Sequence, residues 1–283
     1  MNRLMRVVNR WIDRRTEAVL AKLQQRADRR WAQSPLCQAP LAPPAEYERR
    51  WIEARQRAYP VVDRYELESG AAIEPEWLHR LARLTQVTIK SSDICYQHGR
   101  LLYATVVQYV RDHPHESLTI VDTGTARGFS ALCMAKALSD AGACGKIVSF
   151  DVLPHDARIL WNCVLDADGP RTRQELLQDY ADLVERYLIF QRGDTRREMA
   201  RTSFPRVHVA FLDSVHTDEH VMAEFSSFRG RQKPGDVLFF DDYTPDAYPG
   251  VVAAADRICR EFGYDGVIVE AGSQRRYLIA RKA

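Results

Sequence analysis

The residues best suited to chemistry in this sequence follow two apolar runs. "VAFL" is followed by Asp213, with His216 three residues later, and "DVLFF" is followed by Asp241 and Asp242. Carboxylates bind hard divalent cations, and a histidine with a pKa near about 6.5 can accept a hydroxyl proton. Solvated strand ends and helix caps use the same residue types, so the positions of these four residues in the fold must decide between chemistry and structure.

A second candidate for chemistry is the segment "VDTGTARGFS", which joins an apolar run to a helical pattern. Gly124 permits a tight turn, and Gly128 permits the next helix to begin close to a ligand with its unpaired amide groups directed at it. Asp151 ends the next apolar run, where an acidic side chain can accept hydrogen bonds from ribose hydroxyls. The alternative interpretation is an ordinary turn between a strand and a helix.

The spacing of the glycines favours adenosine over a dinucleotide. Ala126 stands where the dinucleotide fingerprint Gly-x-Gly-x-x-Gly has its middle glycine, which lets the backbone approach a pyrophosphate. The chain also lacks the Tyr-x-x-x-Lys pair of short-chain dehydrogenases. A reductase is therefore disfavoured.

The elements that must position these residues alternate between strands and helices. Apolar runs predict strands at 117–122, 146–151, 187–191, 207–213, 236–241, 266–270 and 276–280. Helical patterns lie between them, including 173–187, 195–203, 217–229 and 250–263. The pattern predicts an α/β fold with a doubly wound, mostly parallel seven-stranded sheet closed by an antiparallel hairpin, and ligands bind such sheets at the carboxyl ends of the strands.

The first 113 residues predict a different organisation. Residues 1–30 carry nine Arg and Lys against three Asp and Glu, a local charge of +6 within a chain of net +2. Residues 1–45 are predicted to form a basic amphipathic helix and a proline-rich linker, residues 46–113 a helical segment, and residues 114–283 the ligand-binding domain. The basic helix suits an anionic membrane surface or a subunit contact, and the helical segment suits a cap on the ligand or a subunit interface.

Composition predicts the location of the protein, the state of its cysteines and its partners. The chain has no run of 18 apolar residues, and arginines interrupt its amino terminus, so neither a membrane span nor a signal peptide is expected. The six cysteines are scattered without a Cys-x-x-Cys pair, which favours reduced thiols in a cytoplasm and no zinc site. Aromatic and basic residues do not alternate along a strand, so nucleic acid is not an expected partner.

At this point the sequence resembles a known family. The runs "IVDTGTARGFSAL", "IVSFD", "GDT", "VAFLDSVHTDEHVMAEF" and "KPGDVLFFDDY" are similar to class I S-adenosylmethionine-dependent methyltransferases. More narrowly, the chain resembles the branch of macrocin-type and rhamnosyl O-methyltransferases and the proteins called cephalosporin hydroxylases. The resemblance covers roughly residues 85–283. It departs from the family at Asp122, where glutamate is frequent, and at Val215, where some members carry a second acid.

The resemblance implies roles for the residues at the cofactor. Asp122 and Ser130 would hold the methionine end of S-adenosylmethionine, with Gly124 and Gly128 as its backbone cradle. Asp151 would bind the ribose. Asp194 would lie near the adenine, and the alternative for this residue is the capping of the helix that follows it.

The resemblance also favours a divalent cation such as Mg²⁺ bound by Asp213, Asp241 and Asp242, to orient and activate a hydroxyl group. Both residues of the Asp241–Asp242 pair can bind only if their strand has already ended, because consecutive side chains on a strand point to opposite faces. His216 would be the proton acceptor.

We therefore expect an O-methyltransferase that acts on a hydroxyl of a sugar or similar polar molecule, and a homo-oligomer is compatible with the sequence. Two alternatives remain: a metal-independent transferase that uses His216 alone, and a cofactor-binding protein without transferase activity that serves as an assembly partner.

Overall fold

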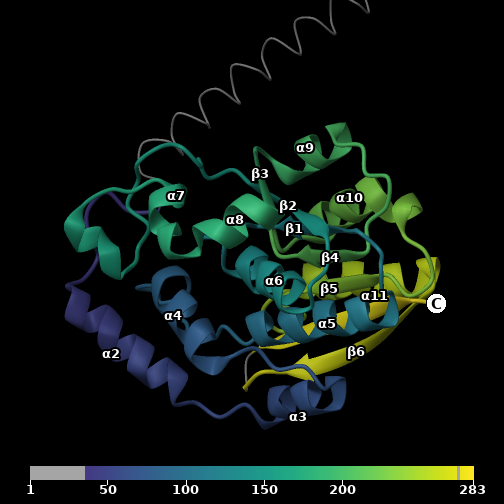
Figure 1. Ribbon diagram of the computed structural model, residues 1–283, viewed down its shortest axis with the longest axis horizontal. Helices are drawn as coiled ribbons and strands as arrows, with labels where there is room; N and C mark the ends of the chain where they lie inside the picture. Colours follow the sequence, from purple (N-terminus) through teal and green to yellow (C-terminus); the bar gives the residue numbers. More distant parts are fainter. Residues whose placement is uncertain (1–35, 273–274) are drawn as a thin grey trace, which may run out of the picture.

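A computed structural model of the chain describes residues 36–272 and 275–283 (Figure 1). Its centre is a seven-stranded sheet in the order β3-β2-β1-β4-β5-β7-β6. The strands are β1 (Leu118–Thr123), β2 (Gly145–Asp151), β3 (Leu188–Arg192), β4 (Val209–Leu212), β5 (Val237–Phe240), β6 (Tyr264–Glu270) and β7 (Arg276–Lys282). The first five are parallel, whereas β7 pairs antiparallel with both β5 and β6. The predicted doubly wound sheet with its closing hairpin is confirmed.

Helices cover both faces of the sheet because the strands are apolar on both sides. Alternate residues of β4 and β5 enter two separate cores: Phe211 and Phe239 join one, and Leu212 and Phe240 join the other. The first core packs against α5 (His98–Asp112), α6 (Phe129–Asp140) and α8 (Ala181–Tyr187). The second packs against α9 (Thr195–Arg201), α10 (Asp218–Phe228) and α11 (Pro249–Phe262).

The helical segment before the sheet consists of α2 (Pro44–Arg55), α3 (Pro60–Ser69), α4 (Pro75–Thr85) and α5. Figure 1 shows α2, α3 and α4 on the side of the sheet away from α9 and α10. Their buried side chains belong to the same core as α5 and α6, so this segment packs directly on the sheet domain. Of the basic helix and proline-rich linker predicted over residues 1–45, residues 1–35 lie outside the described residues.

One predicted helix differs in the structure. The pattern over 173–187 predicts a single helix, but the chain forms α7 (Arg173–Leu176), a short 3₁₀ turn (Gln178–Tyr180) and α8. Tyr180 interrupts the helix with ψ at 17°, and its ring packs edge-on against Trp77 of α4 at 5.5 Å between centroids. The sequence pattern does not reveal this contact, because it joins residues far apart in the chain.

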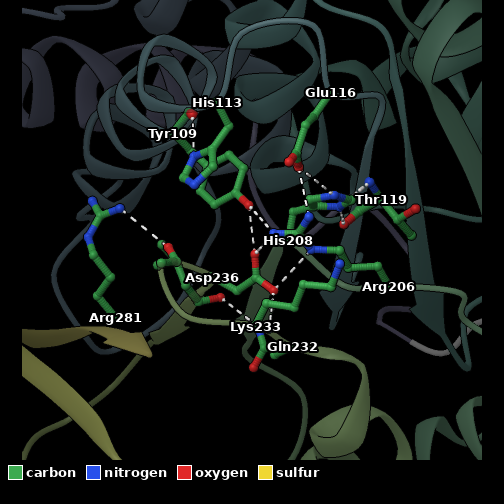
Figure 2. A network of polar contacts seen from close by, with 12 residues as sticks. Tyr109, His113, Glu116, Thr119, Arg206, His208, Gln232, Lys233, Asp236 and Arg281 are labelled. Atoms are coloured by element: carbon green, nitrogen blue, oxygen red, sulfur yellow. Dashed lines mark hydrogen bonds and ion pairs between the residues drawn. The ribbon is translucent and has the colours of Figure 1, made fainter. Parts of the chain in front are cut away.

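A polar network holds the amino ends of the strands (Figure 2). The buried Asp236, just before β5, accepts hydrogen bonds from the hydroxyl of Tyr109 at 2.6 Å, from Arg206 Nη2 at 2.9 Å and from the amide of Lys233 at 2.6 Å. Arg206 also pairs with Glu116 at 2.9 Å. Each charge of this network has an opposite charge beside it, which makes it a structural anchor between α5 and the sheet.

Candidate active site

The loops after β1 and β4 meet closely at the carboxyl end of the sheet. A Cβ atom on Gly124 would lie 1.9 Å from the backbone oxygen of Asp213, and the φ angle of Gly124 is +83°, so only glycine fits this position. On the other side, the Asp213 amide donates a hydrogen bond to Thr123 Oγ1 at 3.1 Å. The glycine turn and the candidate catalytic aspartate are therefore one structural unit.

The carboxylate of Asp122 is fully buried at the end of β1. It accepts a hydrogen bond from Ser130 Oγ at 2.8 Å and a short one from the hydroxyl of Ser149, a β2 residue that the sequence analysis did not single out. Burial is the main cause that raises the pKa of Asp122 to about 6, and the two serine hydroxyls oppose it. Asp122 and Ser130 thus lie together, as the family resemblance requires.

The turn of residues 124–128 has an unusual backbone. Ala126 adopts a left-handed conformation with φ at +43°, which is costly for a residue with a Cβ atom. Its amide donates to Asp151 Oδ2 at 2.6 Å, and its carbonyl accepts from Arg173 Nη2 at 2.8 Å. Gly128, with φ at +92°, begins α6 without a side-chain cap, so no side chain takes the first amide groups of that helix.

Arg173 was missed by the sequence analysis. Its guanidinium is almost fully buried, lies over the rings of Trp161 and Phe190 at 5.4 and 5.3 Å, and donates to the turn at Ala126. Burial lowers the pKa of this guanidinium to about 10, and the charge of Asp151 opposes that shift. The connection after β2 thus buries Trp161 in the core and holds the glycine turn through Arg173.

Asp194 lies at the amino end of α9, where its side chain accepts a hydrogen bond from the amide of Arg196 at 3.1 Å. It also pairs with the Arg196 guanidinium at 3.3 Å. The helix-capping alternative therefore describes the geometry of this residue directly, while its proposed place beside an adenine stays a prediction.

Asp213, His216 and Asp242 converge in front of the glycine turn. His216 Nε2 lies 3.2 Å from Asp213 Oδ1 and 3.5 Å from Asp242 Oδ2, and the three candidate ligand atoms lie within 4.8 Å of one another. Strand β5 has ended before the aspartate pair, and Asp242 has a left-handed φ of +52°. The condition for Asp242 to point towards Asp213 is therefore met.

Asp241 has a different environment. Its Oδ1 accepts a hydrogen bond from the Asp242 amide at 2.8 Å, and its Oδ2 faces Arg275 Nη1 at 3.5 Å. The other guanidinium nitrogen of Arg275, Nη2, lies 3.4 Å from Asp242 Oδ1. The structure thus groups His216, rather than Asp241, with the ligand atoms of Asp213 and Asp242.

Electrostatics at this end of the sheet are unbalanced. Three carboxylates share one guanidinium, and loss of hydration, followed by the charges of Asp241 and Asp242, raises the pKa of Asp213 well above its ordinary value. Burial and the Asp241 charge also raise the pKa of Asp242, to about 7. Burial lowers the pKa of His216, so its imidazole is neutral near pH 7 and free to bind a proton or a cation.

A cavity of about 840 Å³ opens beside the cluster. Part of its wall comes from the helical segment, through Arg57, Tyr59 and residues 92–95, and part comes from Asp242, Tyr248 and Arg275. The ring of Tyr248 packs edge-on against His216 at 4.5 Å between centroids, whereas the hydroxyl of Tyr243 is bonded to Asp256. The helical segment therefore helps to form the space in front of the cluster.

Comparison with known proteins agrees with this geometry. Residues 121–243 match a family described as "Methyltransferase domain", a span that begins in β1 and ends just after Asp242. This segment is a methyltransferase domain. The predicted similarity to class I S-adenosylmethionine-dependent methyltransferases is confirmed, while the narrower branch stays a prediction.

Solved structures share the fold of this methyltransferase. Cofactor-bound Rv0187 from MTB is similar with a TM-score of 0.54 and 16% identity, over 80% of this chain and 98% of that one. SAH-bound PaMTH1 from Podospora anserina is similar with a TM-score of 0.52 and 13% identity, over 78% of this chain and 95% of that one. The O-methyltransferase TomG from Streptomyces achromogenes, in complex with SAM, is similar with a TM-score of 0.51 and 15% identity, over 81% of this chain and 99% of that one. No curated protein sequence matches the chain.

Proposed function

We propose that this methyltransferase transfers the methyl group of S-adenosylmethionine to a hydroxyl group of a polar small molecule, such as a sugar, with the help of a divalent cation. The observation that carries the proposal is the convergence of Asp213, His216 and Asp242 directly in front of the glycine turn. The related folds of the O-methyltransferases TomG and NovP support the reaction type.

The residues around the turn fit the cofactor. The uncapped start of α6 offers amide groups to a carboxylate, and the buried Asp122 with Ser130 offers acceptor oxygens for an ammonium group. Asp151 would exchange one of its two amide contacts, to Ala126 or Leu153, for a ribose hydroxyl. S-adenosylmethionine, when bound, supplies an electrophilic methyl group.

The acidic cluster fits a divalent cation by its charge. Asp213, Asp241 and Asp242 repel one another when all three are ionised, Arg275 and Lys90 offset this repulsion in part, and a divalent ion would favour the ionised carboxylates. Asp213 and Asp242 would be the carboxylate ligands, with His216 Nε2 in the same ligand group. A nitrogen ligand suits Mn²⁺ or Fe²⁺ better than Mg²⁺, which prefers oxygen. A bound cation would lower the pKa of the acceptor hydroxyl and orient its oxygen.

A second candidate follows from the hydrogen bond between His216 and Asp213. If Nε2–H donates to Asp213 Oδ1 at 3.2 Å, Asp213 fixes the tautomer and leaves Nδ1 as a base for the acceptor hydroxyl, without a metal. The same nitrogen cannot donate this proton and bind a cation, so the two mechanisms exclude each other at His216.

The cavity favours a hydrophilic acceptor. Its wall combines the guanidinium groups of Arg57 and Arg275 with the carboxylates of Asp93, Asp242 and Asp246. Donors and acceptors of both charges around one space suit an uncharged molecule with several hydroxyl groups, which can satisfy both kinds of partner.

Methyl transfer is tested with radiolabelled S-adenosylmethionine and a panel of glycosides and other polyols, before and after chelation of divalent ions. We expect turnover with at least one acceptor, its loss on chelation and its recovery on addition of Mn²⁺ or Mg²⁺. Turnover that survives chelation but not His216→Ala would establish the metal-independent mechanism instead.

Calorimetric titration with S-adenosylmethionine tests the cofactor site and the alternative of an assembly protein. Asp151→Ala should weaken binding by about tenfold or more, since it removes a charged hydrogen-bond acceptor. Asp156→Ala, an exposed acid in the same connection, is the matched control and should bind as the wild type does. Absence of binding to the wild type would contradict the proposed function, whereas tight binding without any methyl transfer would favour the assembly protein.

A further inference from the structure

A buried glutamate on α10 contacts the segments that carry the glycine turn, Asp213 and Asp194. Glu224 is almost fully buried, yet its carboxylate lies among hydroxyl groups of three other segments. Oε1 accepts short hydrogen bonds from Thr195 Oγ1 and Ser214 Oγ, and Oε2 accepts one from Thr123 Oγ1 at 3.3 Å. Glu224 Oε1 also lies 3.3 Å from His220 Nε2.

The three hydroxyl groups belong to the loops of the site. Thr123 is the last residue of β1, immediately before the glycine turn, and Ser214 directly follows Asp213. Thr195 follows Asp194 at the start of α9, the segment expected near the adenine. One carboxylate thus contacts the residue before the glycine turn, the residue after Asp213 and the first residue of α9.

The hydrogen bonds around Glu224 run in one direction. Thr123 Oγ1 accepts the amide proton of Asp213 at 3.1 Å while its own proton is directed to Glu224 Oε2. His220 Nε2, one helical turn before Glu224, lies 2.8 Å from Thr195 Oγ1, and the Thr195 hydroxyl donates to Glu224 Oε1. The carboxylate therefore fixes the orientation of each hydroxyl, which in turn fixes the backbone of Asp213.

We infer that Glu224 is a positioning residue of the methyl-transfer site, which holds the Asp213 loop and the α9 loop in register with the glycine turn. Buried carboxylates are costly to desolvate, and this one accepts its hydrogen bonds from hydroxyl groups beside the His220 imidazole, a weaker arrangement than the guanidinium pairing of Asp236. The inference rests on the proposed function for its effect on binding, but the link between the loops is independent of it.

The test compares three proteins: the wild type, Glu224→Gln and Asp236→Asn. The glutamine keeps the size of the side chain but offers one acceptor oxygen in place of two. Asp236→Asn removes the charge of an equally buried acid at the other end of the sheet and serves as the matched control.

Amide hydrogen exchange is the first measurement. Glu224→Gln should accelerate exchange in peptides covering residues 211–217 and 193–198, whereas Asp236→Asn should leave both unchanged and accelerate exchange around residues 105–113. Wild-type exchange in both loops of Glu224→Gln would overturn the inference.

Binding of Mn²⁺, followed by its electron paramagnetic resonance, and of S-adenosylmethionine, followed by calorimetry, is the second measurement. Glu224→Gln should weaken Mn²⁺ binding by about 10- to 100-fold, as loss of an outer-shell partner of a metal ligand does. Ser214→Ala should weaken mainly Mn²⁺ binding, and Thr195→Val mainly cofactor binding, which separates the two loops even if Glu224→Gln folds poorly. Failure of the wild type to bind either ligand would count against the proposed function, while hydrogen exchange would still decide the role of Glu224.

Discussion

Strand β5 has an aspartate at each end, and the two differ in how their charge is compensated. Asp236, at the amino end, accepts four hydrogen bonds, two of them from Arg206, and every neighbour is a side chain or amide of the fold. Asp241, at the carboxyl end, shares one guanidinium with Asp242, and Asp213 lies close by. The amino end is built for stability, whereas the crowded carboxylates of the carboxyl end have raised pKa values, so a proton or a bound cation can relieve their repulsion.

The comparison also explains why residue type alone does not mark an active site. Both ends combine a buried aspartate with a histidine and an arginine: His208 and Arg206 at one end, His216 and Arg275 at the other. At the carboxyl end, the loops that leave the sheet line a cavity of about 840 Å³. Parallel strands direct their connections to that end, so ligand sites form there.

Replacement of a ligand at the carboxyl end should have the largest effect. Asp242→Asn should reduce methyl transfer by more than about a hundredfold, because loss of a direct ligand exceeds the loss of an outer-shell partner. Calorimetry should show S-adenosylmethionine binding within about threefold of the wild type, since Asp242 lies outside the glycine turn. Activity close to that of the wild type would remove Asp242 from the mechanism.

Replacement at the amino end should affect stability instead. Asp236→Asn leaves Arg206 with Glu116 as its remaining acidic partner and should lower the free energy of unfolding by about 3 kcal/mol. Urea unfolding followed by circular dichroism gives this value. Methyl transfer per folded molecule should not change, and a selective loss of activity would contradict the division between the two ends.

The buried Asp122 should give the carboxyl end a distinctive pH dependence. Its pKa is raised from an ordinary 3.8 to about 6, so the folded state holds the proton more tightly than the unfolded state. Its contribution to stability is therefore greatest below about pH 4 and falls by about 3 kcal/mol as the pH rises through about 6. Asp213 and Asp242 contribute slopes of the same sign to both proteins, so urea unfolding of the wild type and Asp122→Asn across this range should show a steeper slope in the wild type, and parallel curves would contradict the assignment.

The smallest expected effect separates two tyrosines of the same loop. Tyr243→Phe removes the hydrogen bond to Asp256 and should cost about 1 kcal/mol of stability without a change in KM for the acceptor. Tyr248→Ala, beside His216 and in the wall of the cavity, should raise that KM. Equal effects of the two variants on KM would contradict the assignment of Tyr248, and not Tyr243, to the wall of the acceptor site.

None of the helices among the described residues has the length and apolar character needed to span a bilayer. The proposed contact of the basic amino-terminal helix with an anionic membrane stays a prediction, and binding of the full chain to anionic and neutral vesicles would test it.

The sequence by itself determined the sheet and the positions of its ligand-binding loops. Continuous apolar runs identify strands that are buried on both faces, and their order along the chain implies parallel pairing, so Asp122, Asp151, Asp213 and Asp242 could be assigned to one edge. Gly124 was predicted for its turn, and the structure adds that it makes room for the Asp213 carbonyl.

Only the tertiary structure decided which side chains meet. Arg275 reaches the acidic cluster because β7 runs antiparallel and begins at the carboxyl edge, Arg173 reaches the glycine turn from a connection with no regular pattern, and Glu224 reaches three loops from the middle of α10. Sequence periodicity reports which face of an element is buried. It carries no information on distances between elements far apart in the chain, and the charge balance of the site depends on those distances.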